Sequence, residues 1–229
     1  MHLNVEKIRT LVADAIKRGE EKNNGMPTIH IANVMLPAAG RAFINDANPL
    51  TEEGYNRIPT EIVRPRAIYD GMRSDYHYRT KEVFNSLYII KEMIYSIGHS
   101  EYGTNLYEFL PLLENGQKCF FNVSAEGIVP MRQLLGDHLM TAYTKVEENY
   151  RETNLKRKFS AHSNAYQLIR PRREFGRAEL TLLNDPAWIE AHIDLVIPFN
   201  GHSTQANAVA VTMLEKVEEL KIERFSLTS

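Results

Sequence analysis

The chain has 229 residues, of which 43% are hydrophobic and 24% charged, a composition typical of a soluble globular protein with a sizeable core. No apolar stretch approaches the roughly 20 residues that a membrane-spanning helix needs, and the first residues lack the order of a signal peptide. The single cysteine, Cys119, excludes an internal disulfide and a multi-cysteine metal site, so we expect a reducing, cytoplasmic location.

The formal net charge of −2 hides two basic segments. Residues 151–177 contain eight basic and two acidic residues, and residues 57–81 contain six basic and three acidic residues. Arginine predominates in both, and its planar guanidinium suits bidentate binding of phosphate or carboxylate. The segments indicate either a solvated face that pairs with acids elsewhere or a local site for a phosphorylated small molecule.

The first half of the chain predicts helices around few strands. A helix is expected from Asn4, as its cap, to Gly19, because apolar residues recur there at helical spacing. Residues 20–65 are typical of loops, with one strand in "TIHIANVML". A wide apolar stripe predicts a second helix over residues 80–98, followed by a strand in "KCFFNVS" and a helix over residues 130–150.

The last third predicts strands and one final helix. "AYQLIRP" and "RAELTLLND" are expected to be two strands joined by a basic turn that contains Gly176. "IDLVIPFN" predicts a third strand, Ser203 caps a helix over residues 206–220, and "IERFSLT" predicts a last strand. The pattern indicates one α+β domain over residues 1–229, with a helical N-terminal half (1–130) packed on a mixed sheet.

Familiar catalytic motifs are missing from the sequence. It contains no glycine-rich phosphate loop, no His-Glu-x-x-His metal motif and no Gly-x-Ser-x-Gly elbow. Cys119 is expected to be a buried, inert thiol in a strand. His162 or His202 leaves open a hydrolase or phosphoesterase, although a helix start explains the "GHSTQ" stretch without catalysis.

A resemblance begins at Ala161-His162-Ser163 and Tyr166-Gln167, and continues through a hairpin, Pro198-Phe199-Asn200 and an alanine-rich helix. This order resembles the thymidylate synthase superfamily, which includes pyrimidine nucleotide hydroxymethylases of large phages. The resemblance covers residues 160–229 and implies a thymidylate-synthase-like C-terminal region, a nucleotide-binding part over residues 131–229 and a homodimer. It implies that Asn200 reads the O4 and N3–H edge of a uracil. The other substrate-binding residues would be Ser163, Gln167, Arg157, Arg172 and Arg173.

The departures from that family leave the reaction open. His162 stands where the family has its nucleophilic cysteine, and without a thiolate there is no covalent addition to C6 of the pyrimidine. If a reaction is retained, the resemblance implies one-carbon transfer to C5 with a folate as donor and His162 as general base. Otherwise the chain only binds a pyrimidine nucleotide. The alternative is a non-enzymatic binding or assembly protein, such as a viral accessory or virion component, whose basic segments contact nucleic acid or an acidic partner.

Overall fold

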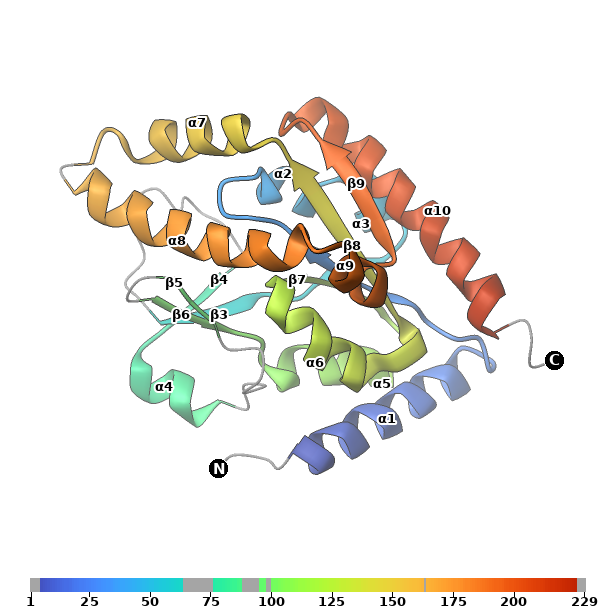
Figure 1. Ribbon diagram of the computed structural model, residues 1–229. Coiled ribbons are helices and arrows are strands. Elements are labelled where there is room, and N and C mark those ends of the chain that lie inside the picture. Colours follow the sequence, from blue (N-terminus) through green and yellow to red (C-terminus); the bar gives the residue numbers. More distant parts are fainter. Residues whose placement is uncertain (1–4, 64–75, 88–94, 98–99, 163, 226–229) are drawn as a thin grey trace.

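Five parallel strands form the central sheet of the protein. A computed structural model describes residues 5–63, 76–87, 95–97, 100–162 and 164–225 (Figure 1). The strand order is β2-β7-β1-β8-β9. The strands are β1 (His30–Val34), β2 (Tyr55–Arg57), β7 (Lys118–Val123), β8 (Leu139–Val146) and β9 (Leu195–Phe199). The central strands of the sheet are covered on both faces, so burial along β1 and β8 is nearly continuous rather than alternating.

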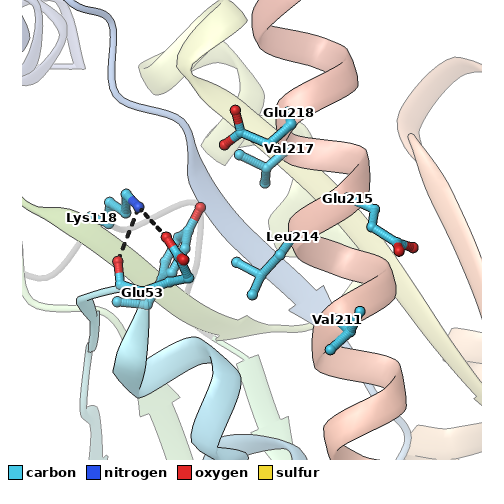
Figure 2. A pocket seen from close by; sticks show the side chains of 8 residues that line it. Glu53, Lys118, Val211, Leu214, Glu215, Val217 and Glu218 are labelled. Carbon is cyan, nitrogen blue, oxygen red and sulfur yellow. Dashed lines mark hydrogen bonds and ion pairs between the residues drawn. The ribbon is translucent and has the colours of Figure 1, made fainter.

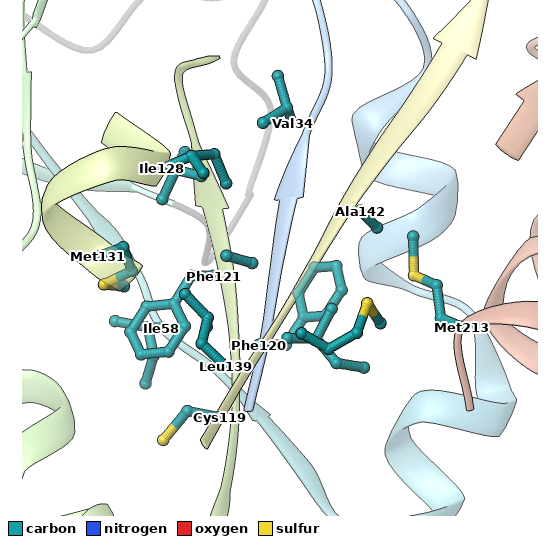
Figure 3. Close-up of a cluster of buried hydrophobic side chains, with 14 of the residues drawn as sticks. Val34, Ile58, Cys119, Phe120, Phe121, Ile128, Met131, Leu139, Ala142 and Met213 are labelled. Atoms are coloured by element: carbon teal, nitrogen blue, oxygen red, sulfur yellow. The ribbon is translucent and has the colours of Figure 1, made fainter. Parts of the chain in front are cut away.

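Helices cover both faces of this sheet. The helices α2 (Arg41–Asn45), α3 (Asn48–Glu52) and α10 (Ala206–Phe225) lie on one side, whereas α1 (Val5–Lys22), α5 (Leu106–Glu114) and α6 (Ala125–Leu135) lie on the other (Figure 1). Figure 3 shows the alternation within β7, where Phe121 points toward α6 and Phe120 toward α10. Phe121 also makes an edge-to-face contact with Phe109 of α5 at 5.2 Å between ring centroids.

A smaller sheet lies between β2 and α5 in the chain. Its strand order is β4-β3-β6-β5, and its strands are β3 (Thr60–Val63), β4 (Tyr76–Arg79), β5 (Tyr95–Ile97) and β6 (Ser100–Gly103). β3 pairs with β4 in parallel and with β6 in antiparallel fashion. The short helix α4 (Lys81–Ser86) begins at Thr80, whose side chain accepts a hydrogen bond from the backbone of Val83.

A helical hairpin connects the last two strands of the main sheet. It consists of α7 (Glu148–Phe159) and α8 (Ala165–Leu183), which pack against each other and are followed by α9 (Pro186–His192) (Figure 1). Two short 3₁₀ turns, Gly136–His138 and Ser203–Gln205, precede β8 and α10. Within the described ranges, no helix is both long enough and apolar enough to cross a membrane.

The predicted mixture of helices and sheets is confirmed, and so are several elements. The strands in "TIHIANVML", "KCFFNVS" and "IDLVIPFN" correspond to β1, β7 and β9, and the last helix to α10. The first helix is also present, although its predicted cap, Asn4, lies outside the described residues. It continues past Gly19 to Lys22, because that glycine is a packing position: a Cβ there would lie 2.1 Å from the carbonyl oxygen of Leu113.

The prediction of a strand hairpin over residues 165–185 was wrong. One helix, α8, runs through both Pro171 and Gly176. Gly176 does not form a turn; a Cβ at this position would lie 2.8 Å from Nη1 of Arg151, so the glycine lets α7 and α8 approach closely. The expected mixture of helices and sheets stands, but among the described residues the last third of the chain supplies helices and a single strand, β9.

Three further boundaries were wrong. The helix predicted over 130–150 ends at Leu135, where Gly136 has a φ of 53°, and the chain then forms β8. The helix predicted over 80–98 ends at Ser86, residues 88–94 lie outside the described residues, and residues 95–97 form β5. The strand predicted at "IERFSLT" is the last turn of α10 as far as Phe225. Residues 20–65 were expected to hold one strand, but their described part, which ends at Val63, contains three strands and two short helices.

Candidate functional site

The carboxyl ends of β1, β7, β8 and β9 meet at one edge of the main sheet, where open parallel sheets bind their ligands. A loop of residues 35–40 leaves β1 at this edge and enters α2. This strand–loop–helix order is that of a phosphate-binding P-loop, whose pattern is Gly-x-x-x-x-Gly-Lys-Ser/Thr. Here Met35, Arg41 and Ala42 stand at the first glycine, the lysine and the hydroxyl position, and Gly40 alone matches.

The β1–α2 loop is closed on itself. The backbone N–H of Ala39 donates to the carbonyl oxygen of Leu36 at 3.1 Å, and Ala38 takes a φ of 66° between them. Met35, Leu36 and Ala39 are buried in the hydrophobic core. A phosphate cradle needs backbone N–H groups that point at the anion. In this loop, buried apolar side chains and the Leu36–Ala39 turn occupy the space that the phosphate would need.

Helix α7 covers the loop and the turn after β9. Asn154 Nδ2 donates to the carbonyl oxygen of Ala38 at 3.2 Å. The hydroxyl of Tyr150 donates to the carbonyl oxygen of Gly201. Gly201 has a φ of 82°, and a Cβ there would lie 1.9 Å from the Tyr150 ring. Only glycine fits this position. Helix α7 therefore packs directly on the chain that follows β1 and on the turn that follows β9.

Asn200 acts as a turn former in this structure. Its side chain is exposed, its Oδ1 accepts from the backbone N–H of His202 at 3.0 Å, and its own N–H donates to Gln205 Oε1 at 3.2 Å. These bonds close the turn between β9 and α10, which is a common role of asparagine.

The other residues predicted for a substrate site lie in the α7–α8 hairpin. His162 lies at its tip, beyond the end of α7, and Ser163 lies outside the described residues. Since α7 has 12 residues, it is about 18 Å long, and Tyr150 near its start contacts the Asn200–Gly201 turn. His162, which bonds to Phe159 at the end of α7, and Asn200, in the turn that Tyr150 contacts, thus lie at opposite ends of α7. Gln167 is exposed in the first turn of α8.

The arginines of the hairpin are largely engaged within it. Arg173 binds Glu152 through Nε at 2.8 Å, and this hydrogen bond lowers the pKa of the Glu152 carboxyl. Arg172 donates to the carbonyl oxygen of Leu168 at 2.6 Å and stacks on Phe159, with its guanidinium carbon 4.6 Å from the ring centroid. Arg157 is exposed in the last turn of α7. Arg172 and Arg173 of this basic segment therefore help to hold α7 and α8 together.

A row of polar side chains lies on the main sheet just below the edge. Asn33 and Asn122 are register partners on β1 and β7. Asn122 Nδ2 donates to Asn45 Oδ1 of α2 at 2.9 Å, and Thr144 Oγ1 donates to Asn33 Oδ1 at 2.9 Å. In the part of the chain that is described, the buried Asn33 Nδ2 and Asn122 Oδ1 have no hydrogen-bond partner. Buried polar groups without a partner are uncommon in native folds.

A pocket opens beside this row at the carboxyl end of β2. We call it the edge pocket; its volume is about 450 Å³, within the range of small-molecule sites. Arg57 binds Asp46 across it at 2.9 Å, and the Asp46 side chain is 73% exposed. Its lining residues are Asn45, Asp46, Leu50, Thr51, Tyr55, Asn56, Arg57 and Phe120. The pocket combines an apolar floor, amide groups, one guanidinium and one exposed carboxylate.

A second pocket lies under α10, at the amino-terminal ends of β2 and β7 (Figure 2). We call it the α10 pocket; its volume is about 290 Å³. Glu53, Glu215 and Glu218 line it together with one cation, Lys118, which binds Glu53 at 3.1 Å. The excess of carboxylates disfavours a phosphate there, and the position is remote from the carboxyl edge.

Two buried side chains on strands of the main sheet do not suit catalysis. Cys119 is fully buried, as predicted, and burial raises the pKa of its thiol to about 12. His30 is also buried, and burial together with the neighbouring His138 lowers its pKa to about 3. Its Nδ1 accepts a hydrogen bond from the backbone N–H of Cys119 at 3.2 Å. Both groups are neutral near pH 7 and have structural roles.

Sequence reasoning did not single out the residues of the edge pocket. Arg57 was part of a basic segment, but nothing in the sequence distinguished it from its neighbours. Asn45 and Asn122 are 77 positions apart and come together only through the sheet. The one available signal was Asn122 itself, a polar side chain near the end of a buried strand.

Comparison with known proteins identifies the fold. No family model and no curated protein sequence matches the chain. A similar solved structure is that of guanylate kinase from Anaplasma phagocytophilum, with a TM-score of 0.55 and 14% sequence identity over 86% of this chain and 95% of that one. At this identity the likeness shows the fold alone.

This likeness corrects the predicted relationship to the thymidylate synthase superfamily. The similar structure is a guanylate kinase, and the segment that carried the resemblance is helical where a hairpin was expected. The predicted thymidylate-synthase-like region and the one-carbon transfer to a pyrimidine were therefore wrong. The folate, the homodimer and the roles given to His162 and Asn200 came from that resemblance and lose their basis with it.

Proposed function

We propose that the protein binds a nucleotide in the edge pocket and does not transfer its phosphoryl groups by a P-loop mechanism. The observation that carries the proposal is the position of this pocket. It lies at the carboxyl end of β2, the outer strand of a parallel sheet, in a fold that is similar to a nucleotide kinase.

The pocket contains the chemistry that a nucleotide requires. Arg57 would hold the phosphate by exchanging its bond to the exposed Asp46 for charge-assisted bonds to the ligand. Asn45 and Asn56 offer amide groups that pair with the edge of a base. The rings of Tyr55 and Phe120 supply the apolar floor against which such ligands pack.

The loop chemistry argues against phosphoryl transfer. In a P-loop the lysine contacts the β- and γ-phosphates, the Ser/Thr hydroxyl binds Mg²⁺, and an aspartate on a nearby strand completes the metal site. This chain has Arg41 and Ala42 at the first two positions, and its neighbouring strand β7 presents the neutral Asn122. We therefore expect nucleotide binding without phosphoryl transfer by a P-loop.

Isothermal titration with GMP, GDP, GTP, AMP and UMP tests the proposal. We expect binding of at least one of these ligands, and we expect Arg57→Ala to weaken it about tenfold or more, because a charge-assisted hydrogen bond is lost. The fold should tolerate this change, since an ion pair with an exposed partner contributes about 1 kcal/mol or less.

Arg18→Ala is the matched control. Arg18 also binds a glutamate, Glu114, at 2.7 Å, but it belongs to α1 on the other face of the sheet, so its replacement should leave nucleotide affinity unchanged. Heats equal to those of buffer for all five nucleotides at millimolar concentration would refute binding. Equal affinities of the wild type and Arg57→Ala would refute the edge pocket as the site.

A further inference from the structure

Four ionisable side chains and one amide meet where the small sheet contacts α5. We call this group the Glu61 cluster; its members are Glu61, His77, Arg79, Asn105 and Glu108. Glu61 and His77 are register partners on β3 and β4, so their side chains lie on the same face of the small sheet. Glu108 reaches this face from the first turn of α5. Three separate elements thus converge on one point.

The spacing of three ligand atoms suits a metal ion better than hydrogen bonds. His77 Nδ1 lies 3.4 Å from Glu61 Oε1 and 3.3 Å from Glu108 Oε1, whereas N–H···O bonds have a usual length of about 2.9 Å. Ligands at about 2.1 Å from a tetrahedral Zn²⁺ are about 3.4 Å from one another. All three atoms lie within 4.8 Å of one another.

The net charge of the cluster and the orientation of the Glu61 carboxylate also favour a bound cation. With a neutral imidazole, the two carboxylates and the guanidinium give the cluster a net charge of −1, and the Glu61 carboxylate is fully buried. Arg79 Nε donates to Glu61 Oε2 at 2.7 Å and so turns Oε1 toward His77. Asn105 Nδ2 lies 3.4 Å from the same Oε1. Outer bonds of this kind orient metal ligands in proteins.

Arg79 also limits access to the cluster. Its Nη2 lies 3.3 Å from His77 Nδ1 and 3.4 Å from Glu61 Oε1, so this amino group must turn outward when an ion enters. The Arg79 side chain is 33% exposed, which gives the outer end of the guanidinium room to move while Nε stays on Glu61.

We propose that Glu61, His77 and Glu108 bind one divalent transition-metal ion, with Zn²⁺ as the preferred ion. One imidazole nitrogen and two carboxylate oxygens suit Zn²⁺, whereas Mg²⁺ and Ca²⁺ prefer oxygen ligands alone. The ion ties β3 and β4 to α5, and three protein ligands leave a fourth position for water. This site is separate from the edge pocket, and the proposal stands without the proposed nucleotide binding.

Titration of the chelator-treated protein with ZnCl₂ tests the site, together with the metal content per chain after gel filtration. We expect one bound Zn²⁺ per chain, and we expect His77→Gln and Glu108→Gln each to weaken binding about tenfold or more. Both side chains are partly exposed, so circular dichroism should show folded variants. Glu61→Gln is unsuitable, because it disturbs the buried partner of Arg79.

His138→Gln is the matched control. His138 also faces a glutamate, with Nε2 3.6 Å from Glu20 Oε1, but it is not part of a three-ligand group within the described residues. It should keep the wild-type affinity. Zn²⁺ bound equally well by His77→Gln, Glu108→Gln and the wild type would mean adventitious binding to surface histidines and would overturn the proposal. So would unchanged hydrogen exchange at residues 76–79 when Zn²⁺ is added to the wild type.

Discussion

At the scale of single residues, the polar groups inside the protein are held by bonds that sequence cannot reveal. His30 is one example. It lies in the central strand β1 and accepts a hydrogen bond from the backbone of Cys119 on β7. Burial and the nearby His138 keep its pKa at about 3, against 6.5 for an unperturbed histidine.

This shift predicts a pH dependence of stability. Above pH 6.5 His30 is neutral in both states, whereas between 6.5 and about 3 the unfolded chain binds a proton that the folded chain does not. The free energy of unfolding should therefore fall as the pH drops below 6.5, by about 1.4 kcal/mol per pH unit from this group. Urea denaturation near pH 7.5 and about pH 5 measures the change.

His30→Asn separates this contribution from those of the other titrating groups. An amide oxygen can accept the bond from Cys119 but does not titrate in this range. The variant should lose about 2 kcal/mol less than the wild type between the two pH values. Equal losses in the two proteins would show that His30 is not the group responsible.

At the scale of elements, the sequence predicted well where one periodicity ran uninterrupted. β1, β7, β9 and α10 have long apolar runs or stripes and were recognised. β8 was missed because a central parallel strand is buried on both sides: only Lys145 of its eight residues is exposed, so its pattern does not alternate. Short apolar runs of this kind fit a helix and a strand equally well.

The misassigned helix α8 shows a second limit. Pro171 and Gly176 are typical of turns, and their spacing suggested a hairpin. Gly176 instead provides room for the buried Arg151 of α7, a requirement set by a residue 25 positions away. The candidate site has the same limit, because Asn45, Arg57 and Phe120 share a pocket only after β2 and β7 have paired.

Contacts between elements also lead to a prediction about α6. The helix has a local cap, since Ser124 Oγ accepts from the N–H of Gly127 at 3.1 Å. It has a second cap from α8, since the buried Glu179 carboxylate accepts from the N–H of Ala125 at 2.6 Å. Glu179→Leu should lower the free energy of unfolding by about 2–3 kcal/mol, because it leaves a buried N–H without its charged acceptor.

Ser124→Ala is the reference for that measurement. Loss of a local cap should cost about 1 kcal/mol. Urea denaturation of the two variants compares the caps directly. A Glu179→Leu variant that is no less stable than Ser124→Ala would show that α8 contributes nothing to the start of α6.

At the scale of the whole molecule, the fold is similar to that of a nucleotide kinase, but the side chains at the P-loop positions are not those of a kinase. The arrangement of a parallel sheet, a strand–loop–helix and an inserted small sheet is similar to that of a guanylate kinase. The groups at the key positions are not those of a P-loop, because Met35 and Leu36 are packed into the core. A fold positions a site, but the side chains in that site determine what it does.

The last prediction follows from this difference between the fold and its side chains. Incubated with ATP, Mg²⁺ and GMP, the protein should form no more GDP than a protein-free sample, as measured by nucleotide chromatography beside a guanylate kinase as positive control. Arg41→Lys combined with Ala42→Ser restores two positions of the P-loop pattern. This variant should remain inactive, because the loop stays closed by the Leu36–Ala39 turn and filled by buried apolar side chains. GDP formed in proportion to the wild-type protein, and lost in Arg41→Ala, would instead mean that the loop opens around a phosphate and that the guanidinium replaces the lysine.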